Sequence, residues 1–147
     1  MKYHFINIEF ATPEYDEMVA LRDLVLRQPL GLQFTVEQLS TEYNDELWGC
    51  YDENFALIGC LIITNLGDNC AKMRQFAVHP SYQRKGVGGY LIAQIEKHLK
   101  QKGYKLIVLN ARDTAIDFYK KNKYESVGEP FVEVGISHLK MEKNIEN

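Results

Sequence analysis

A glycine-bearing turn between a strand pattern and a helical pattern constrains the fold of this chain most. The apolar run at 76–78 indicates the end of a strand, residues 83–89 supply the turn, and a helical pattern continues to about residue 101. A helix N-terminus offers unpaired N–H groups and the positive end of the helix dipole, and glycine lets a ligand approach the backbone closely. With Arg84 and Lys85 beside it, the turn predicts a phosphate-binding site.

The glycine spacing excludes two common phosphate-binding motifs. The chain has no Gly-x-x-x-x-Gly-Lys-Ser/Thr sequence, which defines a P-loop. The turn also lacks the Gly-x-Gly-x-x-Gly spacing of dinucleotide-binding domains. Gly86 and Gly88 alone would equally suit an ordinary tight turn, so the remaining phosphate hypothesis is the pyrophosphate of another cofactor.

The order of hydrophobic patterns predicts one α/β (α+β) domain over residues 1–147. Its 147 residues, 46% hydrophobic and 25% charged, are typical of a globular domain with a substantial core. The expected order predicts a mixed, mostly antiparallel sheet flanked by helices on both sides. The expected elements are a strand at 3–10, helices at 13–27 and from 35, strands at 45–51, 55–64 and 70–78, a helix to 101, a strand at 104–109, a helix from 113, strands at 124–128 and 138–141, and a frayed polar tail at 144–147.

The net charge, the apolar runs and the cysteines limit the expected partners and the expected location of the protein. The net charge of -3 disfavours nucleic acid as the main partner. No apolar run approaches the ~18–20 residues of a membrane span, and the first residues lack the apolar stretch of a signal peptide. Cys50, Cys60 and Cys70 form no C-x-x-C pair and fit reduced thiols, so we expect a cytoplasmic protein without a metal site.

Three segments together resemble one enzyme superfamily. Gln83-x-x-Gly86-x-Gly88 resembles the Q/R-x-x-G-x-G/A acetyl-CoA motif of the GNAT superfamily of acyl-CoA-dependent N-acyltransferases. The segment 76–80 resembles its fourth strand, and 115–124 resembles its A-x-x-F/L-Y-x-x-x-G-F/Y element, in the same order and spacing. The segments 22–32 and 131–141 are similar to a smaller, ElaA-like branch.

The resemblance implies an N-acetyltransferase that uses acetyl-CoA and an amine acceptor. It implies that the fourth strand leaves backbone N–H groups free for the pantetheine arm and the thioester. We expect direct attack in a ternary complex, because a covalent route needs an activated thiol and no cysteine has a His or Lys beside it, apart from Lys72 near Cys70. The cofactor-binding residues expected from it are Phe76, Ala77, Val78, Gln83, Arg84, Lys85, Gly86, Val87, Gly88, Gly89, Asn110 and Phe118. The acceptor, a small molecule or a peptide amine, is not identified by the sequence.

The resemblance suggests a residue for the general acid but does not identify the general base. Tyr119 occupies the position of the family's tyrosine, which protonates the leaving thiolate. Many relatives place a glutamate on or near the fourth strand, but residues 72–75 hold no carboxylate here. Glu133, His138 or a backbone-held water therefore remain as candidates for the general base.

The chain departs from the family at two further positions. Arg112 stands where relatives often carry asparagine, and Lys123 stands where a glycine is expected. Arg112 becomes a candidate for pairing with an acidic substrate or with a phosphate oxygen, and Arg27 a candidate for binding an anionic group of the acceptor. A non-catalytic acyl-CoA-binding module and a nucleotide-phosphate binder stay open as alternatives, and the exposed edge of such a sheet makes a homodimer an expectation.

Overall fold

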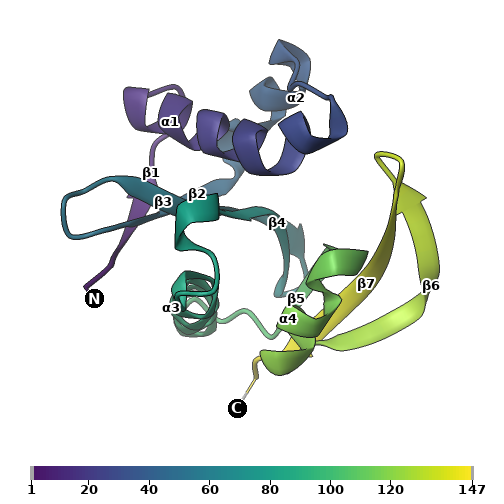
Figure 1. The fold of residues 1–147 in the computed structure, drawn as a ribbon. Coiled ribbons are helices and arrows are strands. Elements are labelled where there is room, and N and C mark those ends of the chain that lie inside the picture. The colour runs from purple at the N-terminus through teal and green to yellow at the C-terminus, as the bar shows by residue number, and fades with distance from the viewer. Residues whose placement is uncertain (1, 147) are drawn as a thin grey trace.

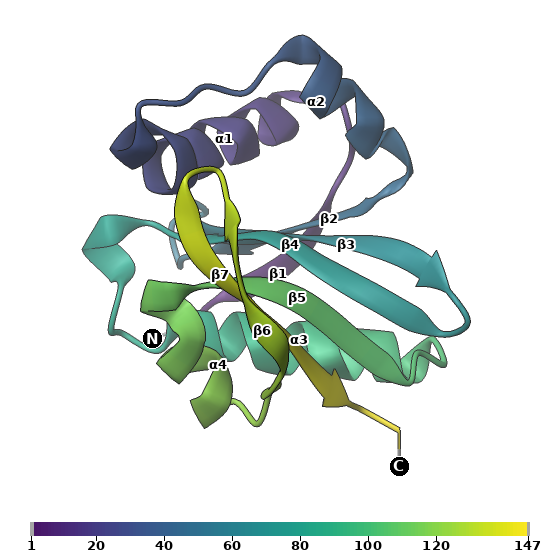
Figure 2. The same ribbon diagram turned by 90° about the vertical axis from the view of Figure 1, so that its right-hand side faces the viewer.

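The computed structural model describes residues 2–146 and contains one seven-stranded sheet with helices on both faces (Figure 1). The sheet order is β1-β2-β3-β4-β5-β7-β6, and the β4–β5 pair is parallel while its other pairs are antiparallel. Helices α1 and α2 cover one face, and α3 and α4 cover the other (Figures 1 and 2). The predicted fold class is therefore confirmed. The strands are β1 (His4–Ile8), β2 (Glu46–Tyr51), β3 (Leu57–Gly67), β4 (Cys70–Val78), β5 (Leu106–Arg112), β6 (Glu125–Glu133) and β7 (Ile136–Asn144), and the α-helices are α1 (Pro13–Arg22), α2 (Val36–Ser40), α3 (Val87–Gln101) and α4 (Ile116–Lys121).

The first helix begins as predicted but changes its winding. The Thr12 side chain accepts a hydrogen bond from the backbone N–H of Tyr15, which caps the first turn of α1. We expected one helix to residue 27, but α1 ends at Arg22 and continues as the π-helical segment η1 (Asp23–Arg27). The short 3-10 segment η2 (Gln28–Leu30) follows and ends at Gly31, whose φ of 69° is left-handed. The helix predicted to residue 27 is therefore present, but its last five residues are π-helical.

Strand lengths differ from the predictions where a turn residue sits inside a strand. We expected a strand to end at Gly128, but its positive φ of 77° is accommodated within a register shift, and β6 runs on to Glu133.

We also expected a frayed tail from Asn144. Instead, Asn144 ends β7, and the N–H of Ile145 donates to the carbonyl of Lys105 at 2.9 Å. Asn147, the last residue of that expected tail, lies outside the described residues.

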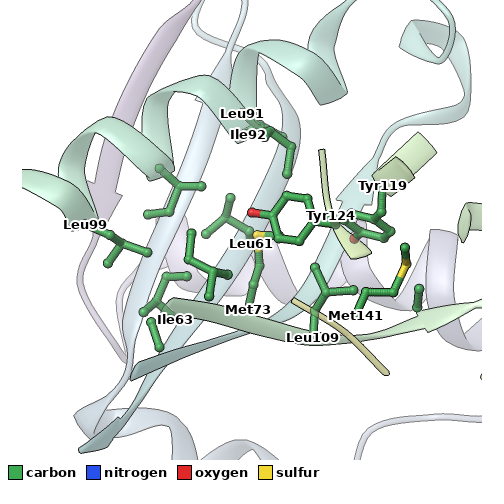
Figure 3. Close-up of a cluster of buried hydrophobic side chains, with 14 of the residues drawn as sticks. Leu61, Ile63, Met73, Leu91, Ile92, Leu99, Leu109, Tyr119, Tyr124 and Met141 are labelled. Atoms are coloured by element: carbon green, nitrogen blue, oxygen red, sulfur yellow. The ribbon is translucent and has the colours of Figure 1, made fainter. Parts of the chain in front are cut away.

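Two hydrophobic clusters lie on the opposite faces of the sheet. The larger one joins the stripe of α3 to β3, β4 and β5, and Figure 3 shows Leu99 of α3 beside Ile63, and Leu61 beside Met73. The smaller one packs α1 against the other face through side chains such as Met18. The helical spacing of apolar residues in α3 thus predicted the buried face correctly.

A buried ion pair holds the helices over the second face together. The guanidinium of Arg22 is 0% exposed and donates to both carboxylate oxygens of Glu42 at 2.8 and 2.7 Å. Glu42 belongs to the 3-10 segment η3 (Thr41–Asn44), and its Oε1 also accepts from the hydroxyl of Tyr15 at 2.7 Å. The pair fixes the segment after α2 against α1 and was not foreseen from the sequence.

Candidate functional site

Separation of β4 from β5 opens a cleft with a volume of about 1160 Å³. The two strands pair only where Cys70, Ala71 and Lys72 face residues 106–108. Beyond that point they diverge, toward the start of α3 and toward α4 respectively (Figure 2). Backbone groups of β4 that point toward β5 beyond Lys72 therefore have no strand partner there, and a ligand in the cleft can satisfy them.

A bulge in β4 accompanies this separation. Ile62 of β3 pairs with Arg74 and Cys60 with Ala77, so β4 carries one extra residue over that interval. Gln75 lies within it and has a left-handed φ of 53°. A bulge bends its strand and increases the local twist. The bend directs the end of β4 away from β5, and the sequence pattern at 70–78 gave no sign of it.

The predicted phosphate turn leads into α3 at one end of the cleft. Gly86 is the N-cap with a left-handed φ of 83°, and the space its Cβ would enter is open. The N–H groups of Val87, Gly88 and Gly89 lie in the first turn of α3, where no intrahelical acceptor exists. The turn therefore provides several N–H donors beside open space, which suits a phosphate group.

Gly88 is required by packing as well. A Cβ on Gly88 would lie 2.9 Å from Cε1 of Phe118, closer than carbon atoms normally approach. The Phe118 ring in turn packs against Tyr119 and Phe76, with centroid separations of 5.1 and 5.6 Å. The absence of a side chain at Gly88 thus lets α4 approach the start of α3 and forms one wall of the cleft.

Most of the predicted site residues line this one cleft. Two do not: the side chain of Val87 is 1% exposed within the core, and the Nζ of Lys85 lies 5.6 Å from the centroid of the Tyr82 ring. For Val87, only the backbone N–H remains available to a ligand. The predicted residues that line the cleft are Arg27, Phe76, Ala77, Val78, Gln83, Arg84, Gly86, Gly88, Gly89, Asn110, Arg112, Phe118, Tyr119, Glu133 and His138.

Tyr119 lies on α4 at the cleft wall and is 6% exposed. Its ring contacts the rings of Phe76 and Tyr124, at centroid separations of 6.1 and 5.7 Å. Burial raises the pKa of Tyr119 above the ordinary value of a phenol. The hydroxyl therefore stays protonated at neutral pH and can donate a hydrogen bond into the cleft.

The two predicted candidates for the base lie together at the β6–β7 hairpin. His138 is buried, and its Nδ1 lies 2.9 Å from the carbonyl oxygen of Ile136. Because a carbonyl only accepts, Nδ1 carries the proton, and Nε2 faces Oε2 of Glu133 at 3.6 Å. In the neutral imidazole, Nε2 is then the atom with the free lone pair. The sequence offered these residues as alternatives, and the structure makes them neighbours.

Comparison with known proteins identifies the family to which this fold and cleft belong. The profile of the family described as "Acetyltransferase (GNAT) domain" matches residues 28–145, most of the chain. The chain belongs to the GNAT acetyltransferase family. GNAT enzymes use an acyl-CoA, so the resemblance noted in the sequence is confirmed at this level. The closer likeness to the ElaA-like branch stays a prediction.

Individual relatives agree with this assignment to the GNAT family. YjcF of Bacillus subtilis, an N-acetyltransferase of uncharacterised activity, is 36% identical over 78 residues, 52% of this chain and 56% of YjcF. The chain spans about half the length of the curated relatives it matches. A GNAT acetyltransferase of Staphylococcus aureus MU50 has 15% identity and a TM-score of 0.79, over 99% of this chain and 100% of that one. A GNAT acetyltransferase of Elizabethkingia anophelis with acetyl-CoA bound has 20% identity and a TM-score of 0.74, over 97% of both chains. At these identities the two structures show a common fold.

The end of the GNAT cleft opposite α3 is lined by basic side chains. Arg112, at the end of β5, donates from Nη2 to the carbonyl of Leu26 in η1 at 2.9 Å. Burial, and then the nearby charge of Arg27, lower the pKa of Arg112, while Glu133 opposes this. The guanidinium of Arg27 lies 4.4 Å from the centroid of the Phe34 ring. The π-helical segment thus carries Arg27 to the cleft.

Sequence reasoning missed Gln75, which lies in the bulge of β4. Its Oε1 is buried and has no hydrogen-bond partner among residues 2–146. It lines both the main cleft and a smaller hollow of about 530 Å³ beside Phe34 and Thr41, so the two spaces adjoin. The available signal is its place directly before the strand end at 76–78, in a segment that otherwise stands out only for its lack of a carboxylate.

No helix within residues 2–146 is long and apolar enough to cross a membrane.

Proposed function

We propose that this GNAT domain transfers an acetyl group from acetyl-CoA to an amine by direct attack in a ternary complex. The observation that carries the proposal is the meeting of three features in one cleft: the open edge of β4, the first turn of α3, and Tyr119. Each supplies a group that this reaction needs, and they come from distant parts of the sequence.

The chain's residues fit the cofactor at the phosphate end of the cleft. The first-turn N–H groups of α3 and the open space at Gly86 suit a pyrophosphate, and Arg84 adds a positive charge on the cleft wall. Acetyl-CoA would supply a thioester, whose acetyl carbon forms the new C–N bond while its C–S bond breaks. Unpaired N–H groups of β4 near residues 76–78 would stabilise negative charge on the carbonyl oxygen.

Protons must move from the amine nitrogen to the departing sulfur. The Nε2 of His138, beside Glu133, is the group we assign to take the proton from the amine. Tyr119 donates a hydrogen bond to the thiolate as it leaves. A thiol, with a pKa of about 8.5, is a stronger acid than the Tyr119 phenol. Complete transfer of the phenol proton to the thiolate therefore requires that the proton lost by the amine then reprotonates the Tyr119 oxygen.

The cysteines support direct attack over a covalent acyl-enzyme. Burial raises the pKa of Cys50 and of Cys60 to about 12, so neither forms the thiolate that would act as a nucleophile. Burial also raises the pKa of Cys70, whose side chain does not line the cleft. No thiol of residues 2–146 is therefore placed and ionised for acyl transfer.

The test combines cofactor binding with the removal of one hydroxyl. Calorimetric titrations should show micromolar affinity for acetyl-CoA and much weaker affinity for ADP, which lacks the pantetheine arm. Tyr119→Phe should lower kcat by roughly 10²-fold or more, as measured by thiol release with an amine panel, and should leave the Kd of acetyl-CoA unchanged.

Tyr124→Phe is the matched control for the loss of the Tyr119 hydroxyl. The Tyr124 hydroxyl lies outside the cleft and donates to Glu96 at 3.0 Å, so its removal should leave kcat unchanged. Binding of acetyl-CoA without turnover of any amine would favour the alternative, a non-catalytic acyl-CoA-binding module. That alternative draws on the lack of a carboxylate at 72–75. No binding at millimolar acetyl-CoA would refute both.

A further inference from the structure

We propose that the acceptor is a small amine that also bears an anionic group, and that Arg27 and Arg112 bind that group. This inference rests on the proposed acetyl transfer and specifies the chemical class of the acceptor. Amino acids and amino phosphonates are the simplest members of this class. Polyamines and uncharged amines fall outside it.

Neither arginine has an acidic partner in the protein. Within residues 2–146, no carboxylate oxygen lies within 4.0 Å of the guanidinium of Arg27 or Arg112. Arg112 uses one N–H on the carbonyl of Leu26, and Arg27 lies over the Phe34 ring. A guanidinium has five N–H donors, so both retain donors for a ligand.

The charges along this end of the cleft are mostly of one sign. Lys72 and Arg74 also line the cleft, and Glu133 is the one acidic residue among all of the side chains that line it. Arg74 already has an acidic partner, because its Nη1 lies 3.3 Å from Oδ2 of Asp45. Two like charges in a partly desolvated place repel each other, and the lowered pKa of Arg112 reflects burial and this repulsion. An anion between them would offset both costs, whereas a polycation would add to the repulsion.

The geometry also places the amine near its base. Arg112 pairs with His138 across the β5–β7 ladder, and directly opposed residues on antiparallel strands point to the same side of the sheet. A group bound by Arg112 is thereby held beside the Nε2 of His138. One small zwitterionic molecule would bring its anionic group to Arg112 and its amine to His138.

Matched acceptors test the inference directly. We would compare a set of amino acids with their carboxamides, with aminophosphonates of the same length, and with a polyamine, following thiol release from acetyl-CoA. The carboxamides keep the amine and remove the negative charge, and the aminophosphonates distinguish a carboxylate from a phosphate-like group. We expect the anionic amines to have kcat/KM values at least 10-fold above those of the carboxamides and the polyamine.

Variants separate the anion contact from general damage. Arg112→Gln and Arg27→Gln should each raise KM for the anionic acceptor roughly 10- to 100-fold, because a charge-assisted hydrogen bond is lost, and should leave KM for the carboxamide and the Kd of acetyl-CoA unchanged. Arg112→Lys retains the charge without the planar fork and should fall between the wild type and Arg112→Gln. Lys97→Gln, an exposed change on α3 outside the cleft, is the control for loss of one positive charge. Melting temperatures show which variants fold.

The outcomes distinguish this inference from the proposed function. Equal or better turnover of carboxamides or polyamines would overturn the anionic acceptor while leaving the acetyl transfer intact. An equal rise in KM for charged and uncharged acceptors in Arg112→Gln would overturn the assigned contact. Absence of acetyl-CoA binding in calorimetry would instead contradict the proposed function itself. Calorimetric binding of an amino acid to the CoA-bound protein, lost in Arg112→Gln, would support the inference without relying on turnover.

Discussion

Removing the negative charge of Glu42 should destabilise the protein severely. Glu42→Gln leaves the guanidinium of Arg22, which is 0% exposed, without its counter-charge. It also replaces one acceptor oxygen by an amide NH₂ that faces a donor, so one of the two bonds at 2.7–2.8 Å is lost. The hydroxyl of Tyr15 competes for the oxygen that remains.

The magnitude follows from the burial of this ion pair. Breaking a buried pair by removing one partner costs about 3–5 kcal/mol, because a charge stays buried without compensation. Domains of this kind have a total unfolding free energy of about 5–15 kcal/mol, so the loss is a large fraction of it. At roughly 2–4 °C per kcal/mol for a domain of about 150 residues, the melting temperature should fall by about 6–20 °C.

Circular dichroism during thermal and urea unfolding measures this loss. Glu9→Gln, an exposed change of the same chemistry, is the control and should stay within about 0.5 kcal/mol of the wild type. The triple variant Tyr15→Phe/Arg22→Met/Glu42→Leu removes both charges and also the buried hydroxyl that would lose its acceptor, and it should recover most of the stability. A loss below about 1 kcal/mol in Glu42→Gln would refute the reasoning, since Arg22 would then have found another way to be solvated.

The same variant should also affect the acceptor end of the cleft. The Phe34 ring lies between Arg22 and Arg27, at 4.6 and 4.4 Å from their guanidinium carbons. Movement of Arg22 would therefore disturb Phe34 and the guanidinium that rests on it. At a temperature where the variant is folded, KM for the acceptor should rise while the Kd of acetyl-CoA stays unchanged.

Three further predictions concern the turn, the thiols and the pH dependence. The unfolding free energy of Gly88→Ala should be lower than that of Gly89→Ala by up to about 3 kcal/mol. The new Cβ at position 88 meets the Phe118 ring, whereas the new Cβ at position 89 meets nothing within 4 Å. Equal stabilities of the two variants would contradict this packing. Alkylation of the native protein at pH 8, followed by mass spectrometry, should modify Cys70 first, since burial raises the pKa of the other two thiols to about 12; uniform labelling would contradict their burial. Burial raises the pKa of the Tyr119 phenol, so the phenol stays protonated through pH 10. The pH profile of kcat below pH 10 should therefore have the same shape in the wild type and in Tyr119→Phe, and a fall in kcat seen only in the wild type would contradict this.

Local signals in the sequence predicted the elements that depend on neighbouring residues. Thr35 and Gln38 have the spacing of a capping box at the start of the helix expected from residue 35, and both reciprocal hydrogen bonds are present. Gly103 has a left-handed φ of 89° just after α3, which is the conformation expected of a glycine that directly follows a helical pattern. These features arise within one or two turns of chain, where residue type and spacing determine the conformation. The order of the elements, and hence the fold class, followed from such signals.

The features that the sequence did not reveal depend on contacts between distant segments. The bulge at Gln75 exists in the register between β3 and β4, which no single segment specifies. Arg22 and Glu42 each look like a surface charge, and their burial follows from the packing of α1 against the segment after α2. The adjacency of Glu133 and His138 likewise depends on how β6 and β7 pair.

In the proposed reaction, the two ends of the cleft would bind negative charge by different chemistry, and this explains why a sequence motif indicates only one of them. At α3 the donors are backbone N–H groups, which any sequence can provide as long as glycine permits the turn and the close approach. The glycines must therefore stand at fixed spacing. At the other end the proposed donors are the side chains of Arg27 and Arg112, which reach the cleft from η1 and from the end of β5. Side chains can be exchanged without altering the fold, so acceptor selectivity can change by substitution there while the cofactor turn stays the same.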